Sequence, residues 1–75
     1  MTDTILLRKV INRSGISITF LAKKLGISRE GFYKKLNGET EYKASEIFKL
    51  QKILHIDDRT RDKIFFAEND ELNSR

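Results

Sequence analysis

The 75-residue sequence contains no cysteine, no proline and no tryptophan, and these absences narrow what the protein can be. Without cysteine there can be no disulfide framework, no thiolate zinc site and no thiol-based catalysis. The apolar runs are only three or four residues long, so we expect neither a membrane span nor a secretory signal peptide. A chain of this length forms one domain, and helices build such a small core most efficiently.

Residues that could carry catalysis or bind a metal are also scarce. The single histidine, His55, lies at the expected end of a helix, and there is no second histidine or any cysteine to complete a metal site. Asp57 and Asp58 could form a carboxylate pair, but a helix N-cap explains them more simply. No glycine-rich phosphate loop and no nucleophile with an adjacent base is present. We therefore expect no enzyme activity, no metal and no cofactor.

Charge is unevenly distributed along the chain, although the net charge is only +4. Residues 1–35 contain eight basic and two acidic side chains, a net charge of +6, whereas residues 36–75 contain seven basic and nine acidic ones, a net charge of −2. This asymmetry favours a polyanionic partner for the first half. A basic face that is simply solvated is the alternative.

The spacing of apolar residues predicts four helices and a short fifth one. They are expected at residues 3–13, 17–24, 29–36 and 44–55, with the last beginning at Asp57 or Asp58. Residues 39–43 read as a polar connection, and residues 68–75 are polar enough that we expect a disordered tail. The sequence thus predicts a compact all-α domain over residues 1–67.

Residues 18–36 form the most specific pattern in the sequence. Gly26 is suited to a positive φ between two helices, and Ser28 is suited to cap the second of them. Ala22 is small enough to let the two helix axes approach at a crossing angle of about 90–120°. Such a corner presents the outer face of the second helix, which can enter a DNA major groove about 12 Å wide.

The string Leu-Ala-Lys-Lys-Leu-Gly-Ile-Ser-Arg at residues 21–29, followed by Leu-Asn-Gly at residues 36–38, resembles the helix-turn-helix of the Xre family of Cro-repressor-like transcriptional regulators. The resemblance covers residues 4–56, and the closing Ile-Phe-Phe-Ala is similar to that of small phage-encoded Cro-like regulators. It implies a four- to five-helix lambda-repressor-like domain that binds double-stranded operator DNA as a repressor. It also implies a homodimer, at least on DNA, in the cytoplasm of a bacterial host, associated with the nucleoid.

The resemblance implies two sets of DNA contacts. The residues expected to read bases are Ser28, Arg29, Glu30, Tyr33 and Lys34. The residues expected to contact the DNA backbone are Thr19, Lys35, Asn37 and Lys43.

The chemistry of the base-reading set agrees with this assignment. Arg29 can donate two parallel hydrogen bonds to guanine O6 and N7. Glu30 can accept a hydrogen bond from a cytosine amino group, or it can instead orient a neighbouring basic residue. Lys34 can reach a guanine or a phosphate one turn later. Tyr33 can contact a thymine methyl group or a phosphate. An ordinary solvated residue is the alternative for each.

Two positions depart from the family pattern. Gly31 lies inside the expected second helix, where it costs about 0.5–1 kcal/mol relative to alanine. Either Gly31 allows a close approach of the helix to the sugar-phosphate backbone, or it is an unfavourable helix residue that tertiary packing tolerates. Lys35 occupies a position that is usually apolar, with Leu36 taking the buried role, so the rotation of this helix is open by about one residue.

Basic residues outside the second helix divide into two groups. Lys23 and Lys24 flank the corner and can neutralise phosphates, as can the backbone candidates Lys35 and Lys43. The first-helix residues Arg8, Lys9 and Arg13 are expected to form a solvated face.

Apolar residues near the end of the chain bear on partners. Residues 64–66, Ile-Phe-Phe, either fill the core or form part of a self-association patch, and Phe20 is a further candidate for partner contact. A rival function is a protein-binding regulator, such as an antitoxin or anti-repressor, that works through the acidic second half and this apolar segment. A purely structural helical module is a third hypothesis.

Overall fold

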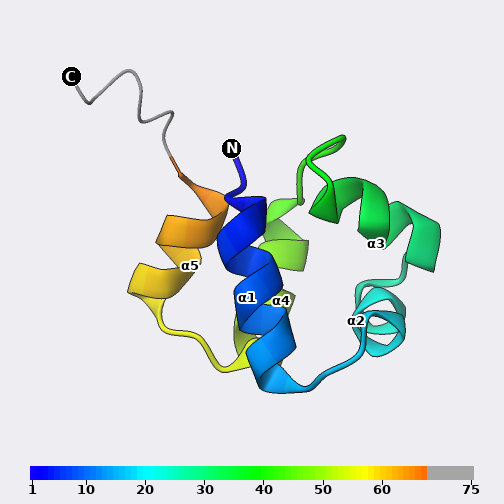
Figure 1. The fold of residues 1–75 in the computed structure, drawn as a ribbon, viewed down its shortest axis with the longest axis horizontal. Coiled ribbons are helices and arrows are strands. Elements are labelled where there is room, and N and C mark those ends of the chain that lie inside the picture. The colour runs from blue at the N-terminus through cyan, green and yellow to red at the C-terminus, as the bar shows by residue number, and fades with distance from the viewer. Residues whose placement is uncertain (68–75) are drawn as a thin grey trace.

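The computed structural model describes residues 1–67, within which the secondary structure is entirely helical (Figure 1). The expected all-α class and the fifth helix are confirmed, whereas the expected tail at residues 68–75 lies outside the described residues. The five helices are α1 (Thr4–Ser14), α2 (Ile18–Leu25), α3 (Arg29–Leu36), α4 (Ala44–Leu54) and α5 (Asp58–Phe65).

Short polar side chains begin four of these helices. Asp3, Ser17, Ser28 and Asp57 each accept a hydrogen bond from the backbone N–H three residues further along. Each of these bonds satisfies one of the N–H groups that a helix N-terminus leaves without a partner. The hydrogen bonds from Thr60 also lower the pKa of the Asp57 carboxyl group. The caps predicted at Ser17 and Ser28 are therefore confirmed, and of the two candidates Asp57 and Asp58 it is Asp57 that caps α5.

Helices α1 and α4 form the middle of the molecule, with α5 on one side and the α2–α3 pair on the other (Figure 1). Helix α1 contacts α3, α4 and α5, and α4 contacts α2 and α5. The two ends of the fold are thus joined through α1 and α4.

The core is built from the apolar face of every helix. Five of its side chains are almost completely removed from solvent: Leu7, Leu21, Phe32, Leu50 and Ile64. Burying each of them contributes about 1.5–3 kcal/mol relative to exposure, before the cost of ordering the chain. Together they include one residue from each of the five helices.

The connection between α3 and α4 is not the purely polar segment expected from the sequence. Tyr42 is only 7% exposed and meets two rings edge to face, with centroid distances of 5.9 Å to Phe32 and 5.3 Å to Phe65. This geometry is favourable for aromatic pairs. Residues 39–43 connect the two helices as predicted, and Tyr42 alone departs from the expected polar segment because contacts far along the chain bury it.

The apolar segment at the end of α5 is divided between core and surface. Ile64 and Phe65 are buried, whereas Phe66 is 56% exposed. The core-packing alternative is therefore confirmed for Ile64 and Phe65, whereas Phe66 lies at the surface.

We expect the replacement Tyr42→Phe to leave the protein at least as stable at neutral pH. The Tyr42 hydroxyl has no hydrogen-bond partner among residues 1–67, and an unpaired buried polar group costs about 1–3 kcal/mol. Burial raises the pKa of Tyr42, the charge of Glu46 raises it further, and Arg8 opposes the change. The unfolded chain therefore loses this proton first, and the wild type should lose stability above about pH 10.

Urea denaturation at neutral pH and at about pH 11 measures this effect. The loss of stability on going to high pH should be smaller for Tyr42→Phe than for the wild type. Tyr33→Phe is the matched control, because the Tyr33 ring is exposed. Equal alkaline losses in the wild type and Tyr42→Phe would contradict the prediction.

Candidate nucleic-acid interface

The turn between α2 and α3 consists of residues 26–28. Gly26 has φ 73°, a left-handed conformation that an L side chain rarely adopts. Its backbone N–H donates to the carbonyl of Lys23, and the N–H of Ile27 donates to that of Ala22 at 3.0 Å. These bonds satisfy carbonyls at the end of α2 and redirect the chain. In Figure 1, α2 is seen nearly end-on, whereas α3 lies above it and extends sideways.

Helix α3 has one buried face and one exposed face. Phe32 and Leu36 are 0% and 3% exposed, which decides the rotation of the helix that the sequence left open. Four of the five expected base-reading side chains lie on the exposed face: Arg29, Glu30, Tyr33 and Lys34. Arg29 and Tyr33, like Glu30 and Lys34, are four residues apart and therefore neighbours on the helix surface. Arg29, Glu30 and Tyr33 line a single shallow depression.

Ser28, the fifth expected base-reading residue, is exposed but has a structural role as well. Its Oγ accepts a hydrogen bond from the N–H of Gly31 at 2.9 Å, so this lone pair is already used, while the hydroxyl proton can still be donated. A Cβ on Gly31 would lie 3.2 Å from the same Oγ. The glycine therefore leaves room for the cap, a local reason that neither interpretation of the sequence included.

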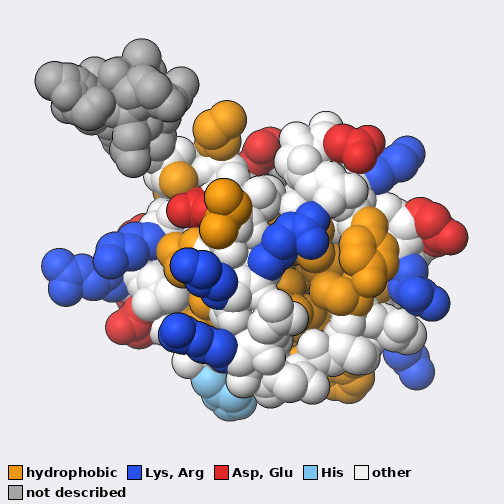
Figure 2. Space-filling view, in the orientation of Figure 1, with side chains coloured by type: hydrophobic (Ala, Val, Ile, Leu, Met, Phe, Trp, Pro, Cys, Tyr) orange, Lys and Arg blue, Asp and Glu red, His pale blue; other side chains and the backbone are white. Residues whose placement is uncertain are grey.

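The four residues expected to contact the DNA backbone differ in how exposed their side chains are. Thr19, Asn37 and Lys43 are exposed, at the start of α2, the end of α3 and the start of α4. Figure 2 shows basic side chains projecting along the edge formed by α2 and α3, with acidic ones among them. The structure thus brings three of the four residues to the surface near α3.

Lys35 is the exception, and its assignment as a backbone contact needs correction. Its Nζ lies 3.2 Å from Oε1 of Glu46 and donates to the carbonyl of Glu41 at 3.0 Å. The Lys35 and Glu46 side chains are only 12% and 8% exposed, and Nζ lies 5.7 Å from the centroid of the Tyr42 ring. The ammonium group ties α3 to α4. Lys35 is therefore committed to contacts within the protein.

Arg8 is exposed, as expected, but it also has partners within the protein. One of its guanidinium nitrogens donates to the Leu36 carbonyl at 3.3 Å and to Oδ1 of Asn37. A cation at this end of α3 is favoured by the helix dipole. The partners are 28 and 29 residues away in sequence, so no local pattern could have revealed this role.

Glu46 is a further buried residue that the sequence analysis missed. In addition to pairing with Lys35, its Oε1 accepts from the N–H of Lys43 at 2.8 Å, which caps the start of α4. A glutamate three residues after a helix start is the sequence signal that could have indicated this.

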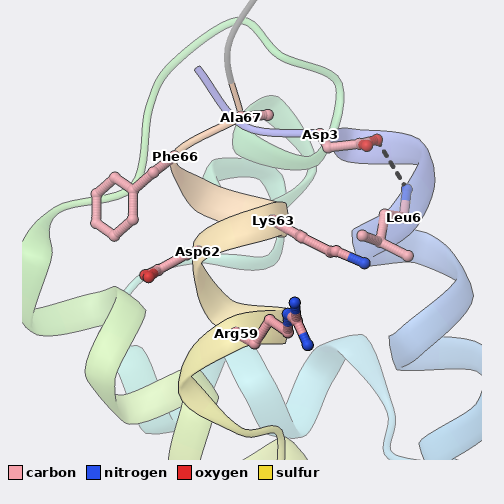
Figure 3. Close-up of a pocket in the computed structure, with 7 residues that line it drawn as sticks. All are labelled: Asp3, Leu6, Arg59, Asp62, Lys63, Phe66 and Ala67. Atoms are coloured by element: carbon pink, nitrogen blue, oxygen red, sulfur yellow. Dashed lines mark hydrogen bonds between the residues drawn. The ribbon is translucent and has the colours of Figure 1, made fainter.

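A second hollow lies at the opposite end of the molecule, between the start of α1 and α5 (Figure 3). Two carboxylates line it, but Asp3 is used in capping α1 and Asp62 lies 2.9 Å from a guanidinium nitrogen of Arg61. Arg59 and Lys63 add charges of opposite sign. The arrangement includes no nucleophile with a base, and no group of three potential metal ligands occurs within residues 1–67. None of the helices described is long and apolar enough to cross a membrane.

A family model matches residues 4–68, which include all five helices. Its description is "Protein of unknown function (DUF739)". The chain belongs to this family. No curated protein and no solved structure matches the chain, so the DUF739 match supplies a family without an assigned activity. Any function must therefore be argued from the surface around α3.

We expect Lys35→Ala to lower the free energy of unfolding by about 1–3 kcal/mol, because it leaves the Glu46 carboxylate buried without its cation. The matched control is Lys34→Ala, which removes an exposed lysine next in sequence and should change stability by less than about 0.5 kcal/mol. Urea denaturation of both variants measures the difference. Equal stabilities would show that the Lys35–Glu46 pair does not support the fold.

Proposed function

We propose that this DUF739 protein binds double-stranded DNA sequence-specifically, with α3 in the major groove, as a phage or bacterial transcriptional repressor. The observation that carries the proposal is the division of α3 into two faces. Phe32 and Leu36 fix the inner face in the core. The pairs Arg29–Tyr33 and Glu30–Lys34 are exposed and form two adjacent rows along the rest of the helix surface. A helix of this length is about 12 Å long, which suits the groove.

The exposed side chains provide the chemistry for base reading. Arg29 offers two parallel N–H donors to guanine, Glu30 accepts from cytosine, and Lys34 donates to guanine or phosphate. Tyr33 adds an apolar ring with a hydroxyl group at the rim of the same depression. Five further exposed side chains can bind phosphates: Thr19, Lys23, Lys24, Asn37 and Lys43.

A homodimer completes the proposal. One short helix reads only a few base pairs, whereas two copies related by a two-fold axis read half-sites about 34 Å apart. The exposed rings of Phe20 and Phe66 are candidates for contact between copies. Such a regulator acts in the bacterial cytoplasm, at the nucleoid.

The second candidate is a protein-binding regulator, an antitoxin or anti-repressor built on the same fold. The exposed apolar residues favour it, because Phe48 and Phe66 are 55% and 56% exposed on α4 and at the end of α5. This reading predicts no dependence on the outer face of α3, which makes the two candidates separable by mutation.

Selection of bound duplexes from a random pool tests DNA binding directly. We expect an inverted repeat to be recovered, because a symmetric dimer requires a symmetric site. Arg29→Ala should weaken binding to this site by about 1–3 kcal/mol and relax the preference at one base pair, whereas Lys43→Ala should weaken all sequences alike. Fluorescence anisotropy with the selected and a random duplex measures both effects.

The control for charge alone is Lys52→Ala, which removes an exposed lysine from the far end of α4 and should leave both affinities nearly unchanged. If Arg29→Ala weakened selected and random duplexes equally, Arg29 would not read a base. Recovery of no duplex at all would overturn the proposal and favour the protein-binding candidate.

Salt dependence provides an independent check. A dimer with about 6–10 phosphate contacts should lose roughly 10³–10⁵ in affinity between about 50 and 200 mM salt, because binding releases counterions from DNA. Anisotropy titrations over this range measure the slope, and Lys34→Glu should weaken binding at every salt concentration. An affinity independent of salt would contradict the assigned contacts.

A further inference from the structure

The contact between Arg8 and Asn37 joins α1 to the end of the helix proposed to read DNA. A guanidinium nitrogen of Arg8 donates to Oδ1 of Asn37 and also to the Leu36 carbonyl at 3.3 Å. Asn37 directly follows the last residue of α3 and is exposed. The side chain of an exposed asparagine would otherwise be free to rotate.

We propose that Arg8 is a positioning residue for DNA binding, which directs the side-chain amide of Asn37 toward a phosphate. Arginine has N–H donors and no acceptor, so the atom of Asn37 that faces it must be the carbonyl oxygen. Holding Oδ1 turns Nδ2 to the opposite side of the planar amide. This inference rests on the proposed function and adds a residue of α1 to its machinery.

The hydrogen bonds of Asn37 leave the side-chain NH₂ as the donor available to DNA. The backbone N–H already donates to the Tyr33 carbonyl at 2.8 Å. Within residues 1–67, Oδ1 is held by Arg8, and Nδ2 donates to no protein acceptor. An NH₂ group held in one orientation loses less entropy on meeting a phosphate than a freely rotating one.

The charge of Arg8 has a second effect at the same place. The C-terminus of α3 carries a partial negative charge of about half an elementary charge, which would repel a phosphate close to Asn37. The guanidinium group at the Leu36 carbonyl offsets this charge. This offset matters for the phosphate that Asn37 binds, so it too is lost when Asn37 is replaced.

A double-mutant cycle on DNA affinity tests the inference. Wild type, Arg8→Ala, Asn37→Ala and the double variant are titrated by anisotropy with the selected duplex and with a random duplex. Each single replacement should weaken binding to both duplexes about five- to tenfold, the loss of one hydrogen bond of typical net strength. The double variant should bind no more than about tenfold more weakly than wild type, because Arg8 acts through Asn37.

Two conservative variants test whether misfolding causes the loss of DNA affinity in the alanine variants. Asn37→Asp keeps an oxygen for Arg8 but removes the donor, so it should fold with an unchanged circular dichroism spectrum and bind DNA at least tenfold more weakly. Arg8→Lys keeps the charge and one donor to Oδ1, so it should restore part of the affinity lost in Arg8→Ala. If Arg8 only stabilised the fold, the affinity lost in Arg8→Ala would instead follow its loss of unfolding free energy, which urea denaturation of the same variants measures.

The outcomes separate this inference from the proposed function. If the wild type binds DNA and requires Arg29, but the effects of Arg8→Ala and Asn37→Ala multiply in the double variant, Arg8 does not act through Asn37 and only the inference fails. Normal affinity of Arg8→Ala would overturn it in the same way. If the wild type binds no duplex, the proposed function fails, and the inference with it.

Discussion

The burial of Phe32 is the interaction on which the rest of the structure depends. Its ring is fully removed from solvent and meets Tyr42, which in turn meets Phe65, so that α3, the following connection and α5 share one aromatic cluster. An α-helix of two turns has little stability of its own and takes its position from packing. Once Phe32 is seated in the core, the directions of Arg29 and Lys34 follow from helical geometry. The proposed DNA-reading face is therefore a consequence of core packing on the opposite side of the helix.

Local patterns were sufficient to predict the helices and their ends. Ser17, Ser28 and Gly26 act within three or four residues of their own positions, and the sequence shows all of their partners. The exposed face of α3 was predictable to within about one residue of rotation, because the spacing of Phe32 and Leu36 indicates the buried side whereas Lys35 left the rotation open.

The errors concern side chains whose partners lie far along the chain. Tyr42 was assigned to a polar connection because it has no local partner that would indicate its burial. Arg8 is exposed as expected, but its contacts at the end of α3 were not foreseen, since they lie 28 and 29 residues along the chain. Lys35 was assigned to the DNA backbone because it is basic and close to the base-reading residues. Its ammonium group instead meets a carboxylate on α4, a pairing that requires the tertiary arrangement of both helices. Helix positions were therefore more predictable than the roles of long charged side chains, which reach across helices.

Contacts within the protein reduce the number of basic side chains that are available for the proposed binding to DNA. Of the eight basic residues in the first 35, Arg8 and Lys35 are committed to contacts within the protein, so the net charge overstates what is free to meet phosphates. Lys9 and Arg13 are exposed on α1, whereas Lys23, Lys24, Arg29 and Lys34 are exposed on α2 and α3. Half of these eight residues are thus exposed on two short helices joined by a three-residue turn. Because screening at physiological salt reduces interactions beyond about 8 Å, such local concentration matters more for phosphate binding than the overall charge of +4.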